Sequence, residues 1–163
     1  MPPPTLFDLF EVDFDRVIVQ RETIYERFLR QRHEFMLLDG ICHHDRERGR
    51  VVSFCQVRPD AWWVRGHVPG RPLMPGVLML EAAAQTANVS VALDDPQASA
   101  DRGFVGFGGV EECKFRDAVV PPSTMYILCT TLENRPRRFT CKTQGLVEGR
   151  VVFEATISGM AMK

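Results

Sequence analysis

The chain has 163 residues, of which 45% are hydrophobic and 25% are charged, and its formal net charge at pH 7 is −1. This length suits a single domain that buries a substantial core. The near-neutral charge excludes the strongly basic surface expected of a nucleic-acid-binding protein. No apolar stretch reaches transmembrane length without polar residues, so no membrane insertion is predicted. The first residues lack the basic and apolar regions of a signal peptide.

The cysteine pattern indicates a reducing compartment. The chain contains an odd number of cysteines, scattered and without a Cys-x-x-Cys pair: Cys42, Cys55, Cys113, Cys129 and Cys141. Such a pattern is typical of reduced core thiols rather than a disulfide framework. We therefore expect a cytoplasmic protein.

The chain is predicted to divide into an N-terminal extension, residues 1–20, and a single domain, residues 21–163. The extension begins with a proline-rich tip, and its later apolar residues alternate with acids. We expect these apolar residues to pack on the body of the protein or on a partner: Phe7, Phe10, Val12 and Phe14. Thr23–Arg32 has the spacing of a short amphipathic helix. Its inward residues would be Ile24, Phe28 and Leu29.

Two strands are predicted next, Met36–His44 and Arg50–Arg58, joined by a charged turn. The run Cys42-His43-His44-Asp45 contains residue types that bind metals. Neighbouring side chains on a strand point to opposite faces, which places two adjacent histidines poorly for chelating one ion. We therefore predict no metal site here.

A Gly/Pro-rich loop followed by an apolar helix occupies the middle of the chain. Three prolines and three glycines between Gly66 and Gly76 exclude regular structure in the loop. Pro75 suits the start of a helix, because its missing N–H is not needed there. The helix is predicted to run from Gly76 to Leu93. Its small and aliphatic residues predict burial on most sides.

Glu81 is the only charged residue between Arg71 and Asp94. An ionised carboxylate alone in an apolar environment is costly, so such a group is paired, hydrogen-bonded or protonated. A protonated glutamate near neutral pH suits a general acid, whereas a carboxylate within a buried network would be structural. The sequence leaves both roles open. Gln85, one turn further on, adds a polar group to the same helix face.

His67 is the only titratable residue between Gly66 and Gly70, on the loop before the helix. Histidine titrates near neutral pH and suits a general base, although a single histidine can equally have a structural role. The backbone N–H groups of Gly76 and Val77 have no acceptor within the predicted helix. They could hold a carbonyl oxygen as negative charge develops on it.

Residues 94–101 are predicted to be a polar loop that ends the helix. Four strands should follow it: Gly103–Phe115, Thr124–Leu132, Arg138–Val147 and Arg150–Met160. Glycines in the first of these strands allow a bulge or a close approach. Glu148-Gly149 suits a tight hairpin turn between the last two strands. One long central helix with about six mostly antiparallel strands predicts an α+β fold in which the sheet wraps around the helix.

The segment His67–Gln85 resembles the signature of the (3R)-hydroxyacyl-[acyl-carrier-protein] dehydratases of the FabZ type, a hot-dog-fold family. The family pattern is His-Phe-Pro-Gly-x-Pro-x-x-Pro-Gly-Val-Leu-x-x-Glu-Ala-x-Ala-Gln, and this chain has Val68 in place of the phenylalanine. The resemblance covers most of the chain after its first 30 residues. Where the family often has His-Arg-x-Pro-Phe, this chain has Gln31-Arg32-His33-Glu34-Phe35, without the proline.

The resemblance implies a hydro-lyase of fatty acid biosynthesis that needs no cofactor. It would reversibly convert 3-hydroxyacyl thioesters on acyl carrier protein, held through 4′-phosphopantetheine, to trans-2-enoyl thioesters. By similarity, His67 would take the C2 proton and Glu81 would protonate the leaving 3-hydroxyl group. Gly76, with Val77 beside it, would bind the thioester carbonyl oxygen. Gln85 would be a supporting polar residue.

The resemblance also implies an assembly. The family builds each site across a homodimer, with His from one subunit and Glu from the other, and often assembles a trimer of dimers. Because the carrier protein is acidic, it should dock on basic residues near the site. The candidates are Lys114, Arg116, Arg137 and Arg138.

Three alternatives bear on this function. A sister group that also isomerises the double bond has Cys, Asp and Trp where this chain has Val77, Glu81 and Ala84, which favours the non-isomerising type. A hot-dog acyl thioesterase would use Glu81 to activate water and would release free thiol. A non-catalytic module would bind acyl groups or carrier protein without turnover.

Overall fold

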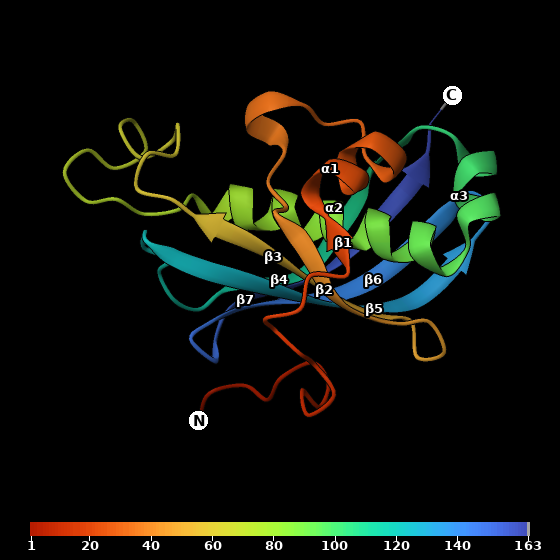
Figure 1. The fold of residues 1–163 in the computed structure, drawn as a ribbon, viewed down its shortest axis with the longest axis horizontal. Helices are drawn as coiled ribbons and strands as arrows, with labels where there is room; N and C mark the ends of the chain where they lie inside the picture. The colour runs from red at the N-terminus through yellow and green to blue at the C-terminus, as the bar shows by residue number, and fades with distance from the viewer. Residues whose placement is uncertain (163) are drawn as a thin grey trace.

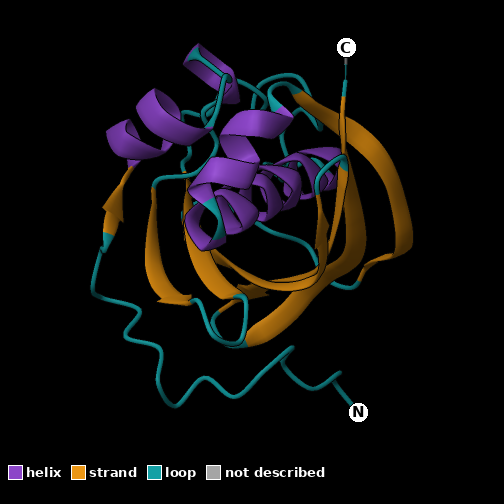
Figure 2. Ribbon diagram, turned by 90° about the vertical axis from the view of Figure 1, so that its right-hand side faces the viewer, coloured by secondary structure: helices purple, strands orange, loops and turns teal. Residues whose placement is uncertain are grey.

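A computed structural model describes residues 1–162, in which seven strands curl around one long helix (Figures 1 and 2). The order across the sheet is β1-β2-β3-β5-β6-β7-β4, and every neighbouring pair is antiparallel. This confirms the predicted α+β class, with the two-residue β1 as an additional strand. The strands are β1 Val19–Gln20, β2 Gly40–Asp45, β3 Arg50–Val57, β4 Val105–Phe115, β5 Ser123–Arg135, β6 Arg138–Val147 and β7 Arg150–Ala161.

The central helix α2, Gly76–Asp94, lies in the concave side of the sheet (Figure 2). Its start at Gly76 was predicted, and its end lies one residue beyond the prediction. Ala82, Ala83 and Ala87 are fully buried, and such small side chains let the helix approach the sheet closely. By length and composition α2 meets the minimum for a membrane span, but most of it is buried inside the protein. The helix therefore forms the core of the domain.

Residues 94–101, predicted to be a polar loop, contain the short helix α3, Pro96–Arg102. The prediction was wrong, although the signals for a helix start are present. The side chain of Asp95 accepts a hydrogen bond from the N–H of Ala98, and Pro96 is the first helical residue.

The helix predicted over Thr23–Arg32 is shorter in the structure and starts earlier, at Arg21. It consists of α1, Arg21–Thr23, and η1, Ile24–Phe28, a single turn of π-helix. The N–H of Leu29 donates to the carbonyl of Ile24 at 3.0 Å, which is the five-residue spacing of a π-turn. Tyr25 and Leu29 are buried beside Ile24.

The strand predicted to begin at Met36 begins instead at Gly40, after the 3₁₀ turn η2, His33–Phe35. The N–H of Leu38 donates to the hydroxyl of Tyr25 rather than to a neighbouring strand. Leu38 is therefore tied to η1, and backbone bonding to β3 begins only at Asp39, whose N–H donates to the carbonyl of Phe54 at 2.8 Å.

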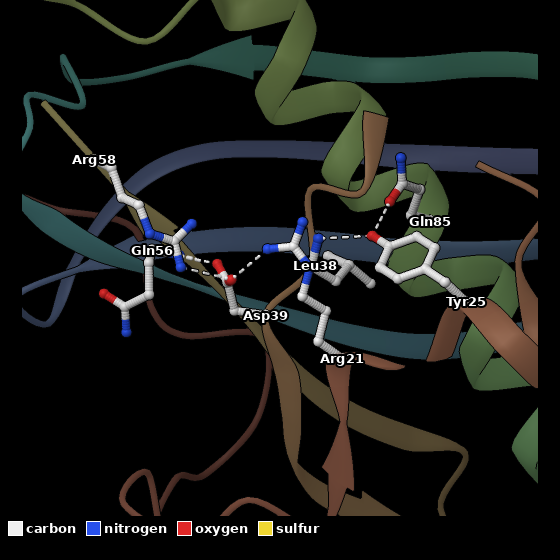
Figure 3. Close-up of polar contacts among 7 residues, drawn as sticks. All are labelled: Arg21, Tyr25, Leu38, Asp39, Gln56, Arg58 and Gln85. Atoms are coloured by element: carbon white, nitrogen blue, oxygen red, sulfur yellow. Dashed lines mark hydrogen bonds and ion pairs between the residues drawn. The ribbon is translucent and has the colours of Figure 1, made fainter. Parts of the chain in front are cut away.

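Asp39 fixes this same segment to β3 (Figure 3). Its carboxylate accepts hydrogen bonds from the N–H of Gln56 at 2.6 Å, from Arg21 at 3.0 Å and from Arg58 at 2.8 Å. The segment that leads from η1 into the sheet thus has a defined position.

The last strands match the prediction closely. Glu148 and Gly149 both have positive φ, 49° and 74°, which suits the two-residue turn between β6 and β7. The glycines of β4 also act as expected, because the register shifts between Phe107 and Gly109. A Cβ atom on Gly106 would lie 2.4 Å from the end of the Met162 side chain, so a larger residue there would require this flexible side chain to move.

The N-terminal segment crosses the outer face of the sheet, opposite α2 (Figures 1 and 2). Phe7 is buried in a cluster with Leu128 and Leu146 of the sheet. The side-chain amide of Gln144 hydrogen-bonds to the backbone of this segment. Its oxygen accepts from the N–H of Leu6 at 2.8 Å, and its nitrogen donates to the carbonyl of Pro4 at 3.0 Å. The outer face is therefore covered by the chain's own first residues.

Candidate active site

His67 is held by backbone contacts on the long loop between β3 and α2, which extends beyond the end of the sheet (Figure 1). Its N–H donates to the carbonyl of Trp63, and its Nδ1 lies 2.8 Å from the carbonyl oxygen of Leu73. A carbonyl only accepts, so Nδ1 carries the hydrogen and Nε2 of the neutral ring keeps a free lone pair. The side chain is exposed. Nε2 is therefore free to take a proton.

The tryptophans before this loop have different environments. Trp63 is buried in the core, whereas Trp62 is 54% exposed. The buried ring and the bond from its carbonyl to His67 anchor the loop at its start.

Glu81 lies in the second turn of α2 and is half-buried. Its Oε1 accepts a hydrogen bond from the side-chain amide of Gln85 at 2.8 Å and a longer one from that of Gln31 at 3.4 Å. Within residues 1–162, no hydrogen bond reaches Oε2. One oxygen of the carboxyl group is thus held, and the other is free for a ligand.

Glu81 lines a cavity of about 220 Å³ between α2, the first part of β4 and β7. Its walls include Phe107, Phe139 and Ile157, and Glu81 is the only charged residue among them. His67 of the same chain does not line this cavity. An apolar space with one carboxyl group suits an acyl chain whose reactive end meets an acid.

A second cavity, of about 620 Å³, continues toward α3. It shares Gln31, Asn88, Phe104 and Val105 with the Glu81 cavity. The Glu81 cavity therefore adjoins further space along α2, and charged residues such as Arg27 and Arg30 line that space.

The first N–H groups of α2, those of Gly76 and Val77, have no acceptor among residues 1–162. The side chain of Val77 is 71% exposed. A Cβ atom on Gly76 would lie 3.0 Å from the ring of Phe115, at the end of β4. The positive end of the helix is thus open to a ligand.

The four predicted docking residues do not form one patch in a single chain. Lys114 pairs across the sheet with Glu154, and Arg138 pairs with Met160, six residues further along β7. This separation is about 20 Å. Arg116 contacts Glu154 and lowers the pKa of that carboxyl group, so its charge is already partnered.

The run Cys42–Asp45 does not gather metal ligands. His44 hydrogen-bonds to Asp94 at 2.8 Å. Across residues 1–162, no group of three or more His, Cys, Asp or Glu side chains could hold a metal ion. Four cysteines are buried as expected, but Cys113 is exposed on β4, so its predicted core position was wrong.

Two residues of the site were not identified from the sequence. Gln31 contacts Glu81 and stands where the related family often has histidine, which was an available signal. Tyr25 contacts Gln85 at 2.7 Å. A signal for its inward position was available, because Tyr25 shares one helix face with Ile24, Phe28 and Leu29.

Comparison with known proteins identifies the family to which the chain is similar. A family model described as a FabA-like domain matches residues 29–156. The 3-hydroxyacyl-[acyl-carrier-protein] dehydratase FabZ of Granulibacter bethesdensis is 33% identical over 138 residues, which are 84% of this chain and 79% of that protein. FabZ of Listeria monocytogenes serotype 4b is 32% identical over 133 residues, 81% of this chain and 89% of that protein.

Among solved structures, a chain of the dehydratase heterocomplex ApeI:P from Xenorhabdus doucetiae has a TM-score of 0.71 at 16% identity, covering 85% of this chain and 90% of its own. A hypothetical thioesterase with coenzyme A from Streptococcus pneumoniae has a TM-score of 0.57 at 12% identity, covering 75% of this chain and 84% of its own. At these identities the two structures confirm the hot-dog fold alone. By its sequence relatives and its family model, the chain belongs to the FabA-like family, among the FabZ-type dehydratases, as the segment His67–Gln85 predicted.

Proposed function

We propose that this chain dehydrates (3R)-hydroxyacyl thioesters on acyl carrier protein at sites formed between two copies of the chain. The FabZ relatives are named as dehydratases of this substrate class, and they match most of the chain. The enzyme is thus a hydro-lyase of fatty acid biosynthesis. The finer claims concern which residues act and on which subunit they lie.

In this mechanism, Nε2 of His67 takes the proton from C2 of the substrate. Electrons from that C–H bond form the C2–C3 double bond, and the C3–O bond breaks. The Oε2 atom of Glu81 protonates the departing hydroxyl group, which leaves as water. The N–H groups of Gly76 and Val77 bind the thioester carbonyl oxygen while it carries negative charge. The elimination is redox-neutral, so no electron acceptor is required.

The observation that carries the shared site is that the Glu81 cavity lacks the His67 of its own chain. A base and an acid that act on adjacent carbons must face the same substrate. The absence of His67 from this lining supports a site in which a second copy supplies the histidine.

The free edge of the sheet supports this arrangement. Among residues 1–162, β4 pairs only with β7, and large apolar residues are exposed along it. Such an edge is a template for pairing with another strand. The exposed residues at this edge are Phe104, Phe107, Val110 and Phe115.

The direction of pairing decides which groups meet. The α2 tip and Phe115 lie at the end of β4, whereas the Glu81 cavity lies at its beginning, near Phe104–Phe107. Antiparallel pairing of β4 with its copy would bring the tip of one α2, with the His67 loop, toward the Glu81 cavity of the partner. The same pairing would bring Lys114 toward Arg137 of the second copy, which favours one basic docking patch per site.

The remaining expectations stay predictions. The trimer of dimers and docking on Arg116 and Arg138 have no specific support beyond the family resemblance. A cytoplasmic location is supported by the buried, unpaired cysteines.

The test is subunit mixing. His67→Ala and Glu81→Ala proteins are each expected to be inactive in hydration of a crotonyl thioester. Mixing them after reversible dissociation should restore about a quarter of wild-type activity, because half of the dimers would be mixed and each would hold one intact site. Mixed dimers verified by native mass spectrometry that show no activity would contradict the shared site. Release of free thiol instead of hydration of the double bond would indicate the thioesterase.

A further inference from the structure

We propose that Tyr25 is a positioning residue for the acid: it fixes the amide of Gln85 so that Oε2 of Glu81 is the oxygen that carries the reactive proton. This inference rests on the proposed role of Glu81. Tyr25 itself does not line the Glu81 cavity, so it acts through Gln85.

The hydroxyl group of Tyr25 makes two hydrogen bonds in the core (Figure 3). It lies 2.8 Å from the backbone nitrogen of Leu38 and 2.7 Å from Oε1 of Gln85, and the residue is only 2% exposed. The N–H of Leu38 can only donate, so the hydroxyl accepts from it. Its own hydrogen is therefore available for Oε1 of Gln85.

The phenol keeps that hydrogen under all ordinary conditions. Burial raises the pKa of Tyr25 well above its usual range, and this effect outweighs the opposing hydrogen bond from Leu38. The charged and titratable groups that influence it are Cys55, Arg21 and Asp39. Tyr25 is thus a permanent donor to Gln85.

This donor and two acceptors together determine which way the Gln85 amide points. With Oε1 turned to Tyr25, Nε2 donates to the carbonyl of Phe35 and to Oε1 of Glu81, each at 2.8 Å. The reverse orientation would place the amide oxygen against two acceptors and the amide nitrogen against a donor. Gln85 is 1% exposed, so water cannot compensate for such a mismatch.

The orientation of Gln85 then distinguishes the two oxygens of Glu81. Oε1 receives the N–H of Gln85 and the longer contact from Gln31. An oxygen that accepts N–H donors is the poorer site for the carboxyl hydrogen, so the neutral acid carries its proton on Oε2. Glu81 is the only charged residue in the cavity lining, so no other ion in that lining competes for this proton.

The test is Tyr25→Phe, with Tyr126→Phe as the matched control. The chain has only two tyrosines, and Tyr126 packs on the outer face of the sheet, near Phe14 and Phe54. We expect Tyr25→Phe to lower kcat about tenfold while KM stays within about twofold, because the residue acts on the acid and not on the substrate. Tyr126→Phe should leave both within about twofold. Equal kcat values for the two variants would overturn the proposal.

A second comparison separates positioning from general damage. If Tyr25 acts through Gln85, the double variant Tyr25→Phe/Gln85→Met should be no slower than Gln85→Met alone. If the losses in kcat of the two single variants multiply in the double variant, Tyr25 does not act through Gln85. Inactive Glu81→Gln together with an unaffected Tyr25→Phe would refute only this inference, whereas active Glu81→Gln would refute the role of the acid itself.

Gln85→Glu keeps the proposal testable if Tyr25→Phe does not fold. This variant retains an acceptor for Tyr25 but replaces the N–H that faces Glu81 with a second acidic group. We expect kcat to fall at least about tenfold and its pH dependence to move to higher pH, because two neighbouring carboxyl groups share a proton more readily than they both ionise. A folded variant with an unchanged pH profile would overturn the proposal.

Discussion

The two halves of the site are held in different ways. His67 is positioned by main-chain groups, the carbonyls of Trp63 and Leu73. Glu81 is positioned by side-chain amides, those of Gln85 and Gln31. Main-chain contacts survive the replacement of a neighbouring side chain, whereas a side-chain network is lost with any one of its members. The base should therefore tolerate changes around it, and the acid should not.

The largest effects should come from the two reacting groups themselves. His67→Ala and Glu81→Gln should each lower crotonyl thioester hydration by roughly 10²–10⁴-fold, because each removes one proton-transfer group. The double variant should be little worse than either single one, since both groups act in one step. A midpoint of thermal unfolding equal to that of the wild type would show that the fold is intact. Near-normal turnover of either variant would remove that residue from the mechanism.

Separating the two subunits should lower activity almost as much. Val110 is the middle residue of β4 and is partly exposed, so pairing about that midpoint would bring two copies of it together. We expect Val110→Glu to give monomers by light scattering and to lose at least about 100-fold in activity, because like charges facing across strands are destabilising.

Leu132→Glu is the matched control, since Leu132 is an exposed apolar residue on the interior strand β5. It should stay dimeric and active. Mixing Val110→Glu with Val110→Lys should restore a mixed dimer through opposite charges. A dimeric Val110→Glu protein would show that β4 is not the joining edge.

A smaller effect should distinguish the two modes of support directly. Leu73→Ala keeps the carbonyl that orients His67, so activity should stay within about threefold. Gln85→Met removes the donor to Glu81 and should cost about 10- to 100-fold in kcat. Steady-state kinetics on crotonyl thioester would compare them. If Leu73→Ala were the more damaging change, the contrast between the two halves would be wrong.

The smallest effect concerns Arg116, near the α2 tip. The hydrogen bond from Arg116 lowers the pKa of Glu154 in the folded chain. An unfolded carboxyl group binds its proton at higher pH, so the stabilisation is present above about pH 4.3 and is lost as the pH falls through the folded pKa. Arg116→Gln should cost no more than about 1 kcal/mol at pH 7 and less near pH 3, by urea unfolding. An equal loss at both pH values would exclude this ion pair as the cause.

The elements with strong local signals could be predicted from the sequence. Pro75 marked the start of α2, and Glu148-Gly149 marked the last hairpin. The helix Pro96–Arg102 was missed although its cap was visible, because the polar composition suggested a loop. The π-turn of η1 had no such signal. Its bond from the N–H of Leu29 to the carbonyl of Ile24 has no counterpart in the residue pattern, which suits an ordinary helix equally well.

The candidate site was predictable as a set of residues but not as a place. His67 and Glu81 stand out by their chemistry within one short segment. The structure separates them: Glu81 lines the cavity and His67 does not. Spacing along one chain cannot indicate the shared site that we propose. The amide network around Glu81 depends on side chains distant in sequence, such as Gln31, which only the fold brings near.

The grip of Gln144 on the backbone near Pro4 and Leu6 has a practical consequence for anyone preparing this enzyme. Proteolytic removal of these residues, or their displacement by a bulky affinity tag fused ahead of Met1, would expose the apolar patch that they cover on the outer face of the sheet. Aggregation of such a preparation would then result from loss of the N-terminal segment and not from a defect in the active site.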